Sequence, residues 1–259
     1  MLYQVLAYYA SFALFALLAM GLSGFCFLLA WLPATDARER WFQRLIHRHF
    51  AFFVRWVTFA RIVPVSYVGG ENLVRPGQGG RVIVANHPGL MDVGWLLARL
   101  PEAICICKPD IGRNPLFAAT AHRAGYLRSN SGHHLLRTAT TKLAAGQTML
   151  VFPEGTRTRN GRLQPFKPGF VAMARKARVP IQLVRIHCDS ELLTKQRPWW
   201  IVPRLPARVT VSVGPCLPPP SEDTAASIRE IETWFRAGTV TESFRPAAEP
   251  AEAHAVVRT

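Results

Sequence analysis

Several motifs that mark large classes of enzyme are missing from this chain. It contains no Gly-x-Ser-x-Gly nucleophile elbow, no His-Glu-x-x-His zinc motif and no P-loop, which excludes the usual serine hydrolases, zinc proteases and nucleotide triphosphatases. Cysteine is scarce, since the chain has only five, and they form no Cys-x-x-Cys pair. We therefore expect no disulfide framework, no metal and no cofactor, in a reducing, cytoplasmic setting.

Charge is missing from residues 1–35, which include no Asp, Glu, Lys, Arg or His. The stretch from Val5 to Trp31 is long enough to cross a bilayer as one helix, and the lack of a basic start argues against a cleaved signal peptide. We expect a retained membrane segment. Gly21, Ser23 and Gly24 also allow a re-entrant hairpin or an interfacial helix. If the segment spans, the arginines after it place the downstream chain in the cytoplasm.

Acidic residues are also scarce, with 16 Asp and Glu against 31 Lys and Arg, and the net charge of +15 predicts a negatively charged partner. Residues 36–63 carry many arginines beside the apolar segment, which favours anionic membrane lipids over nucleic acid. On a helix, four arginines fall within an arc of about 80°: Arg40, Arg44, Arg48 and Arg55. The large apolar side chains are predicted on the other side: Trp41, Leu45, Phe52, Phe53, Trp56 and Phe59. We expect an interfacial amphipathic helix. Packing of its apolar face on the domain core is the alternative, and both can hold.

Strand-like and helix-like segments alternate through residues 64–240. Strands are predicted at 64–70, 82–85, 103–107, 148–152, 181–186 and 209–213, and helices at 88–100, 114–124, 133–145 and 222–237. This alternation predicts an α/β domain with a mostly parallel sheet covered by helices. Residues 241–259 are rich in Ala, Pro and Glu, and we expect a disordered tail there.

The segment 86–92, Asn-His-Pro-Gly-Leu-Met-Asp, pairs a base with a carboxylate. Proline is tolerated in the first turn of a helix, so a helix is predicted to begin at Pro88. His87 would then lie at the entry turn, where Asp92 can accept a hydrogen bond from one ring nitrogen. The other nitrogen would be free to take a proton from a hydroxyl. The alternative is a histidine near an N-cap and an aspartate that serves the helix dipole.

The segment 152–157, Phe-Pro-Glu-Gly-Thr-Arg, follows an apolar strand and suits an anionic ligand. The guanidinium of Arg157 can give two parallel hydrogen bonds to phosphate oxygens, and Gly155 permits close approach of the backbone. Glu154 can hold Arg157 or a substrate hydroxyl in place. A solvated turn with an exposed ion pair is the alternative.

Together, and in this order, the two segments resemble the glycerolipid acyltransferase family, over about residues 64–214. The resemblance implies that His87 deprotonates the acceptor hydroxyl, which attacks an acyl thioester directly, and that Asp92 orients His87. It implies an acceptor-binding role for Glu154, Gly155, Thr156 and Arg157. The implied acceptor is a lysophospholipid, with 1-acylglycerol-3-phosphate as the leading candidate. The implied acyl donor is acyl-CoA or acyl carrier protein. The implied location is the cytoplasmic face of a bacterial inner membrane.

Single basic positions extend the resemblance and also show one departure. Lys108 and Lys167 match basic positions of relatives, although both can equally be solvated surface cations. Relatives usually have an arginine six residues after the glycine matched by Gly125, and this chain has Ser131 there. Arg128 is the candidate replacement, and an altered headgroup preference fits equally. Alternatives are therefore the same chemistry on a lyso-ornithine or polyene lipid, or a non-catalytic membrane scaffold.

Overall fold

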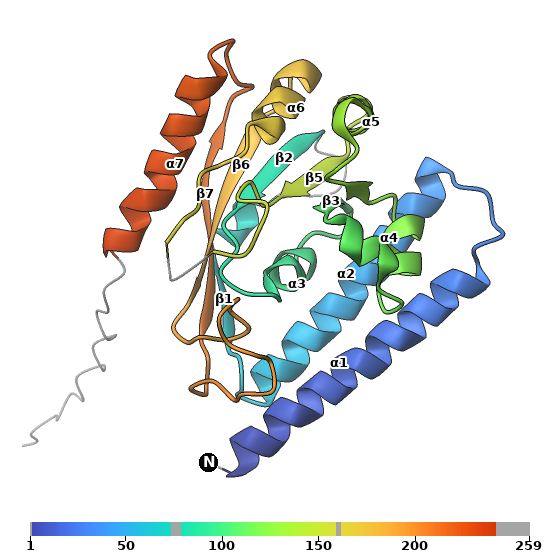
Figure 1. The fold of residues 1–259 in the computed structure, drawn as a ribbon, viewed down its shortest axis with the longest axis vertical. Helices are drawn as coiled ribbons and strands as arrows, with labels where there is room; N and C mark the ends of the chain where they lie inside the picture. The colour runs from blue at the N-terminus through green and yellow to red at the C-terminus, as the bar shows by residue number, and fades with distance from the viewer. Residues whose placement is uncertain (1, 74–78, 159–161, 242–259) are drawn as a thin grey trace, which may run out of the picture.

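A seven-stranded sheet forms the centre of the computed structural model, which describes residues 2–73, 79–158 and 162–241. The strand order is β1-β7-β6-β2-β5-β3-β4 (Figure 1). The strands are β1 Val65–Val68, β2 Arg81–Ala85, β3 Ala103–Cys107, β4 Leu127–Arg128, β5 Thr148–Val151, β6 Ile181–Cys188 and β7 Val209–Leu217. Neighbouring strands are parallel except β6 and β7, which are antiparallel. The predicted mostly parallel α/β sheet is confirmed. The disordered tail was expected at 241–259; Thr241 is helical, and residues 242–259 lie outside the described residues.

Helices cover both faces of the sheet. They are α1 Leu2–Leu28, α2 Asp36–Phe59, α3 Asp92–Leu97, α4 Ala118–Arg123, α5 Gly132–Ala144, α6 Gly169–Ala177 and α7 Thr224–Thr241, with 3₁₀ turns η1 Gly70–Asn72 and η2 Pro109–Arg113. Ile83 and Ala85 of β2 pack toward the side of α1–α4, whereas Val82 and Val84 pack toward α5–α7. Strand side chains alternate between faces, so a strand buried on both sides is apolar throughout. Figure 1 shows α1 and α7 on opposite sides.

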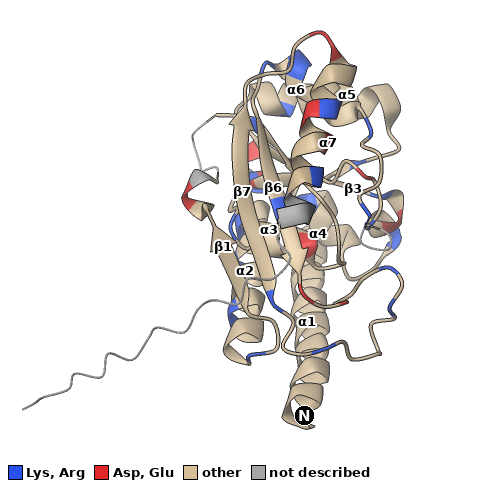
Figure 2. Ribbon diagram, turned by 90° about the vertical axis from the view of Figure 1, so that its left-hand side faces the viewer, with Lys and Arg blue, Asp and Glu red and all other residues tan. Residues whose placement is uncertain are grey.

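The apolar N-terminal segment forms one unbroken helix, α1, which continues through Gly21 and Gly24 instead of folding into a hairpin. By length and composition it is a candidate membrane span, and Figure 2 shows it free of charged residues. Hydrogen bonds join it to the domain near both ends: the Tyr3 hydroxyl donates to the Ala60 carbonyl at 3.1 Å, and Ser23 Oγ to the Pro115 carbonyl at 2.8 Å. Its opposite face stays exposed, including Leu6, Leu17, Met20 and Phe27.

Helix α2 divides its apolar residues between the core and the surface. Phe42, Ile46, Phe53, Val54 and Val57 are buried, so the core-packing alternative holds for that face. Trp41, Phe52 and Phe59 are exposed at 44%, 51% and 84%. The predicted separation of arginines from aromatic side chains is wrong for these three, because at about 100° per residue they fall within the same arc of about 60° as Arg48 and Arg55.

Two predicted helices begin about four residues later than expected, and α7 begins at Thr224, two residues late. α3 begins at Asp92 and not at Pro88, because residues 88–91 form a turn in which the Gly89 N–H donates to Asp92 Oδ2 at 2.7 Å. The Leu90 N–H donates instead to the carbonyl of Leu193. The helix predicted at 114–124 begins at Ala118, after η2. α6 and the two-residue strand β4 were not predicted.

Candidate active site

Neighbouring parallel strands bring the candidate residues to one edge of the sheet. His87 follows β2, Glu154 follows β5, Lys108 follows β3 and Arg128 closes β4. These four strands are consecutive and parallel, so their carboxyl ends meet at the same edge. Open α/β sheets bind ligands at this edge, because loops there are free to diverge above a rigid support.

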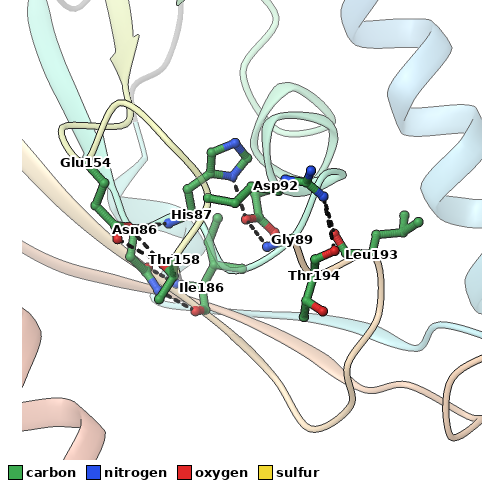
Figure 3. Close-up of polar contacts among 10 residues, drawn as sticks. Asn86, His87, Gly89, Asp92, Glu154, Thr158, Ile186, Leu193 and Thr194 are labelled. Atoms are coloured by element: carbon green, nitrogen blue, oxygen red, sulfur yellow. Dashed lines mark hydrogen bonds and ion pairs between the residues drawn. The ribbon is translucent and has the colours of Figure 1, made fainter. Parts of the chain in front are cut away.

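The side chains of His87 and Asp92 are hydrogen-bonded, with Nδ1 of the ring 2.8 Å from Oδ2 of the carboxylate (Figure 3). The Asp92 side chain is 3% exposed and that of His87 is 19% exposed. The imidazole stacks on Phe152 with ring centroids 4.3 Å apart. Because Nδ1 is held by the carboxylate, Nε2 is the nitrogen left to exchange a proton with a ligand. The predicted contact between base and carboxylate is present.

Burial raises the pKa of the Asp92 carboxyl above its ordinary value. Hydrogen bonding to His87, the His87 charge, the Gly89 N–H and the positive charge of Arg157 act in the opposite direction. The carboxylate is thus costly to bury as an anion, and its partners offset that cost. A buried carboxylate of this kind does not stabilise the fold. It suits a group whose negative charge is needed opposite a protonated His87.

The backbone around His87 is fixed by residues that sequence reasoning missed. Asn86 extends the sheet through its side chain: its amide Nδ2 donates to the Ile186 carbonyl at 2.9 Å, and its Oδ1 accepts from the Ile186 N–H at 2.7 Å. The Thr158 N–H donates to the His87 carbonyl at 2.7 Å. Asn86 is a polar residue directly after a buried strand, and this position could have indicated its structural role. These bonds hold the catalytic turn, residues 86–92, against β6 and the loop after β5.

Glu154 is buried, and its carboxylate supports the catalytic turn. It accepts hydrogen bonds from the His87 N–H at 3.0 Å and the Thr158 hydroxyl at 2.9 Å (Figure 3). It also accepts from the Gln164 N–H at 2.9 Å. Desolvation raises its pKa, and the three donors oppose that shift. The expectation that Glu154 holds Arg157 in place is wrong, because its oxygens accept from His87, Thr158 and Gln164.

Replacing Glu154 with glutamine should weaken catalysis and change how stability depends on pH. The amide keeps one acceptor oxygen but turns an NH₂ group toward a donor, so we expect about a tenfold loss of activity through misplacement of His87. A raised folded-state pKa gives stability that is present at low pH and lost as pH rises through that pKa. Wild type should therefore lose stability in urea unfolding, relative to Glu154→Gln, as pH rises above about 4.5, the ordinary pKa of a glutamate. Identical pH dependence of the two proteins would contradict this.

Arg157 joins the loop after β5 to the loop between β6 and β7. Its Nη1 donates to the carbonyls of Leu193 at 3.0 Å and Thr194 at 3.2 Å. The Leu193 carbonyl also accepts from the Leu90 N–H of the catalytic turn at 3.0 Å. Leu193 has a φ of 53°, a left-handed conformation that a leucine adopts only when its surroundings hold it there.

The remaining predicted residues form the exposed part of the edge. Gly155 has a φ of 65°, in the left-handed region that favours glycine. Thr156 is half-buried, whereas Lys108, Arg128 and Lys167 are exposed. The Arg128 guanidinium lies over Gly112 of η2. These cations surround the edge without contacting His87, and Ser131 is the N-cap residue of α5.

A cavity of about 330 Å³ lies beside Asp92, on the side of the β6–β7 loop. Pro88, Met91, Trp95, Cys188, Leu192 and Val209 are among its lining residues. Its size lies at the lower end of the roughly 300–1,000 Å³ range of small-molecule sites. The cavity was not predicted, because its lining comes from segments far apart in the sequence.

Comparisons with known proteins agree on one family. A profile of the family described as Acyltransferase matches residues 64–187. The chain is 32% identical over 123 residues to a 1-acyl-sn-glycerol-3-phosphate acyltransferase of Helicobacter pylori, covering 44% of this chain and 52% of that protein. It is 28% identical over 198 residues to 1-acyl-sn-glycerol-3-phosphate acyltransferase alpha of Mus musculus, covering 60% of this chain and 68% of that one.

Among solved structures, the fold matches the crystal structure of the 1-acyl-sn-glycerophosphate acyltransferase of Thermotoga maritima. The TM-score is 0.69 at 22% sequence identity, with 94% of this chain and 97% of that chain covered. The sequence matches are shorter, since the chain spans about half the length of the Helicobacter pylori relative.

Proposed function

This chain belongs to the glycerolipid acyltransferase family, and from that premise we propose that it transfers an acyl chain from an acyl thioester to a lysophospholipid hydroxyl. The observation that carries the proposal is the buried Asp92 bonded to Nδ1 of His87 at the carboxyl edge of the sheet, 2.8 Å apart. The preferred acceptor is 1-acylglycerol-3-phosphate, which would give phosphatidic acid. The donor is acyl-CoA or acyl carrier protein, and no further cofactor takes part.

The chemistry needs one proton transfer in each direction. Nε2 of His87 takes the proton of the acceptor hydroxyl as its oxygen attacks the thioester carbonyl. Asp92 keeps the proton on Nδ1 and stabilises the imidazolium that forms. When the tetrahedral adduct collapses, the C–S bond breaks and the imidazolium returns its proton to the leaving thiolate. The nucleophile is the acceptor itself, so no acyl-enzyme forms.

The exposed cations at the edge suit the phosphate groups of both substrates. Lys108, Arg128 and Lys167 surround the strand ends, and Arg157 lies near enough to Asp92 to lower its pKa. Phosphate binding by a guanidinium is strong because two parallel hydrogen bonds form. Ser131 occupies the place where relatives usually have an arginine, which keeps an acceptor with a different headgroup as a second candidate. Acyl transfer measured with 1-acylglycerol-3-phosphate and with lyso-ornithine lipid distinguishes the two acceptors.

The helices α1 and α2 support action at a membrane surface. α1 is joined to the domain at Tyr3 and Ser23, so crossing a bilayer would pull the attached domain into the hydrocarbon. Its exposed apolar face and the exposed aromatic residues of α2, next to arginines, suit an interfacial position on anionic lipids. We place α1 in one leaflet, with the catalytic edge on the cytoplasmic side of a bacterial inner membrane.

Replacing Arg157 with alanine should raise the KM for 1-acylglycerol-3-phosphate by about 10- to 100-fold, because a charged hydrogen-bond donor to phosphate is lost. The KM for acyl-CoA should change little. Arg162→Ala removes a nearby exposed arginine and serves as the control. If Arg157 only fastens the β6–β7 loop, both KM values and the melting temperature will change together, and phosphate recognition by Arg157 will be ruled out.

A further inference from the structure

The β6–β7 loop, residues 189–208, carries three apolar side chains into solvent. Trp199, Trp200 and Ile201, which we call the loop tip, are 51%, 59% and 45% exposed. Large apolar side chains exposed singly are common, but a contiguous group marks a surface that binds something. Figure 1 shows this loop at the end of the molecule where α1 begins.

The loop tip is held in its exposed position by the rest of the loop. Arg197 donates to the carbonyls of Ile201 at 3.3 Å and Val202 at 2.9 Å, and it pairs with Glu191 at 2.7 Å. The two indole rings pack edge to face with centroids 5.9 Å apart. These contacts fix the backbone of the loop at the tip. The exposed indoles are therefore presented in a fixed arrangement.

The loop tip is continuous with the exposed face of α1. The Tyr8 and Tyr9 hydroxyls donate to the carbonyls of Trp199 and Trp200 at 2.8 and 2.9 Å. The Trp199 ring also packs on Phe12, with centroids 5.4 Å apart. Neighbouring Leu6 is 61% exposed. The tip thus extends the apolar surface of α1 onto the catalytic domain.

The charge of the loop matches an anionic surface. Residues 189–208 contain four basic and two acidic side chains, a net charge of +2. Lys195, Arg204 and Arg208 are exposed. Tryptophan is enriched where a bilayer meets water, and basic residues beside it bind anionic headgroups. A protein partner would need a matching apolar surface with acidic residues, whereas a bilayer supplies both features and also contains the proposed acceptor.

We propose that the loop tip inserts into the headgroup region of an anionic bilayer, as a lipid contact on the catalytic domain that continues the exposed apolar surface of α1. Its link to catalysis rests on the proposed function, because the same loop also lines the cavity, with Leu192 and Thr194. Through the Leu193 carbonyl it is bonded to Arg157 and to the catalytic turn. The loop therefore connects the membrane surface to the site.

Vesicle binding of purified full-length protein tests the contact without any substrate. Trp199→Ser/Trp200→Ser should bind phosphatidylcholine vesicles containing phosphatidylglycerol about tenfold more weakly than wild type. Trp199→Phe/Trp200→Phe keeps the apolar surface and should bind nearly as well as wild type. Lys176→Glu, on α6, alters an exposed lysine away from the loop and should not change binding. Removing phosphatidylglycerol should weaken binding by wild type.

A second readout does not depend on the serine variant folding. Brominated lipids quench tryptophans that lie in the bilayer, so the double phenylalanine variant should bind and yet lose a large share of the quenching seen in wild type. Equal quenching in the two proteins, or wild-type binding by a folded serine variant, would overturn the proposal. Binding as predicted without acyl transfer by wild type would leave the lipid contact intact and refute the proposed function.

Discussion

Replacing His87 with alanine is expected to lower kcat by about 10²–10⁴-fold, the usual contribution of a positioned general base. His87 Nδ1 is bonded to Asp92 and its backbone is held by Glu154 and Thr158, so only Nε2 is available for the acceptor proton. The backbone bonds do not depend on the imidazole, and the side chain is partly exposed. The variant should therefore fold like wild type.

Steady-state kinetics with circular dichroism measure this prediction. His122→Ala, which removes an exposed histidine of α4, is the matched control and should retain wild-type activity. Acceptor KM should change less than kcat in His87→Ala, because the lost group acts mainly in the transition state. A correctly folded His87→Ala with wild-type kcat would remove the general-base mechanism.

Replacing Asp92 with asparagine is expected to lower activity by about 10²–10⁴-fold without destabilising the protein. A single oxygen, Oδ2, accepts from both His87 Nδ1 and the Gly89 N–H. An asparagine oxygen in the same place keeps both bonds and loses only the negative charge opposite the imidazolium. Burial raises the pKa of Asp92, so at neutral pH its ionisation opposes folding, and a neutral amide removes that penalty.

Activity and stability should thus move in different directions in Asp92→Asn. Urea unfolding at about pH 7 should give a free energy of unfolding equal to or above that of wild type, while kcat falls. A parallel loss of activity and several kcal/mol of stability would assign Asp92 a structural role at the start of α3, in place of a role in catalysis.

The sheet and the position of the site were predictable because they depend on local patterns. Runs such as Val82–Ala85 and Ala103–Cys107 are apolar at every position, as strands buried on both faces must be. Parallel strands then bring His87 and Glu154 to one edge without further information. α6 was missed, although Phe170, Met173 and Ala174 repeat at helical spacing after Pro168, so the signal was available.

Features that depend on contacts between distant segments were not predictable. The delayed start of α3 is one, because the turn at residues 88–91 bonds to Leu193, about a hundred positions away. A Cβ on Gly89 would lie 2.9 Å from the Leu192 carbonyl oxygen, a close approach that no local pattern reports. The direction of Glu154, toward His87 and away from Arg157, was likewise set by the packing of two loops. The position of α1 along the domain depends on its packing against distant residues, such as Phe15 on Phe53 of α2, and on hydrogen bonds from Tyr3 and Ser23.

Product mass spectrometry tests the central claim most directly. Detergent-purified wild type and His87→Ala would each be mixed with acyl-CoA or acyl carrier protein donors and a panel of lyso-lipids that includes 1-acylglycerol-3-phosphate and lyso-ornithine lipid. The proposed function predicts phosphatidic acid from wild type and none above background from His87→Ala. Another acylated lipid formed only by wild type would keep the mechanism and change the acceptor. The absence of any His87-dependent product across the panel would contradict acyl transfer and favour a membrane scaffold.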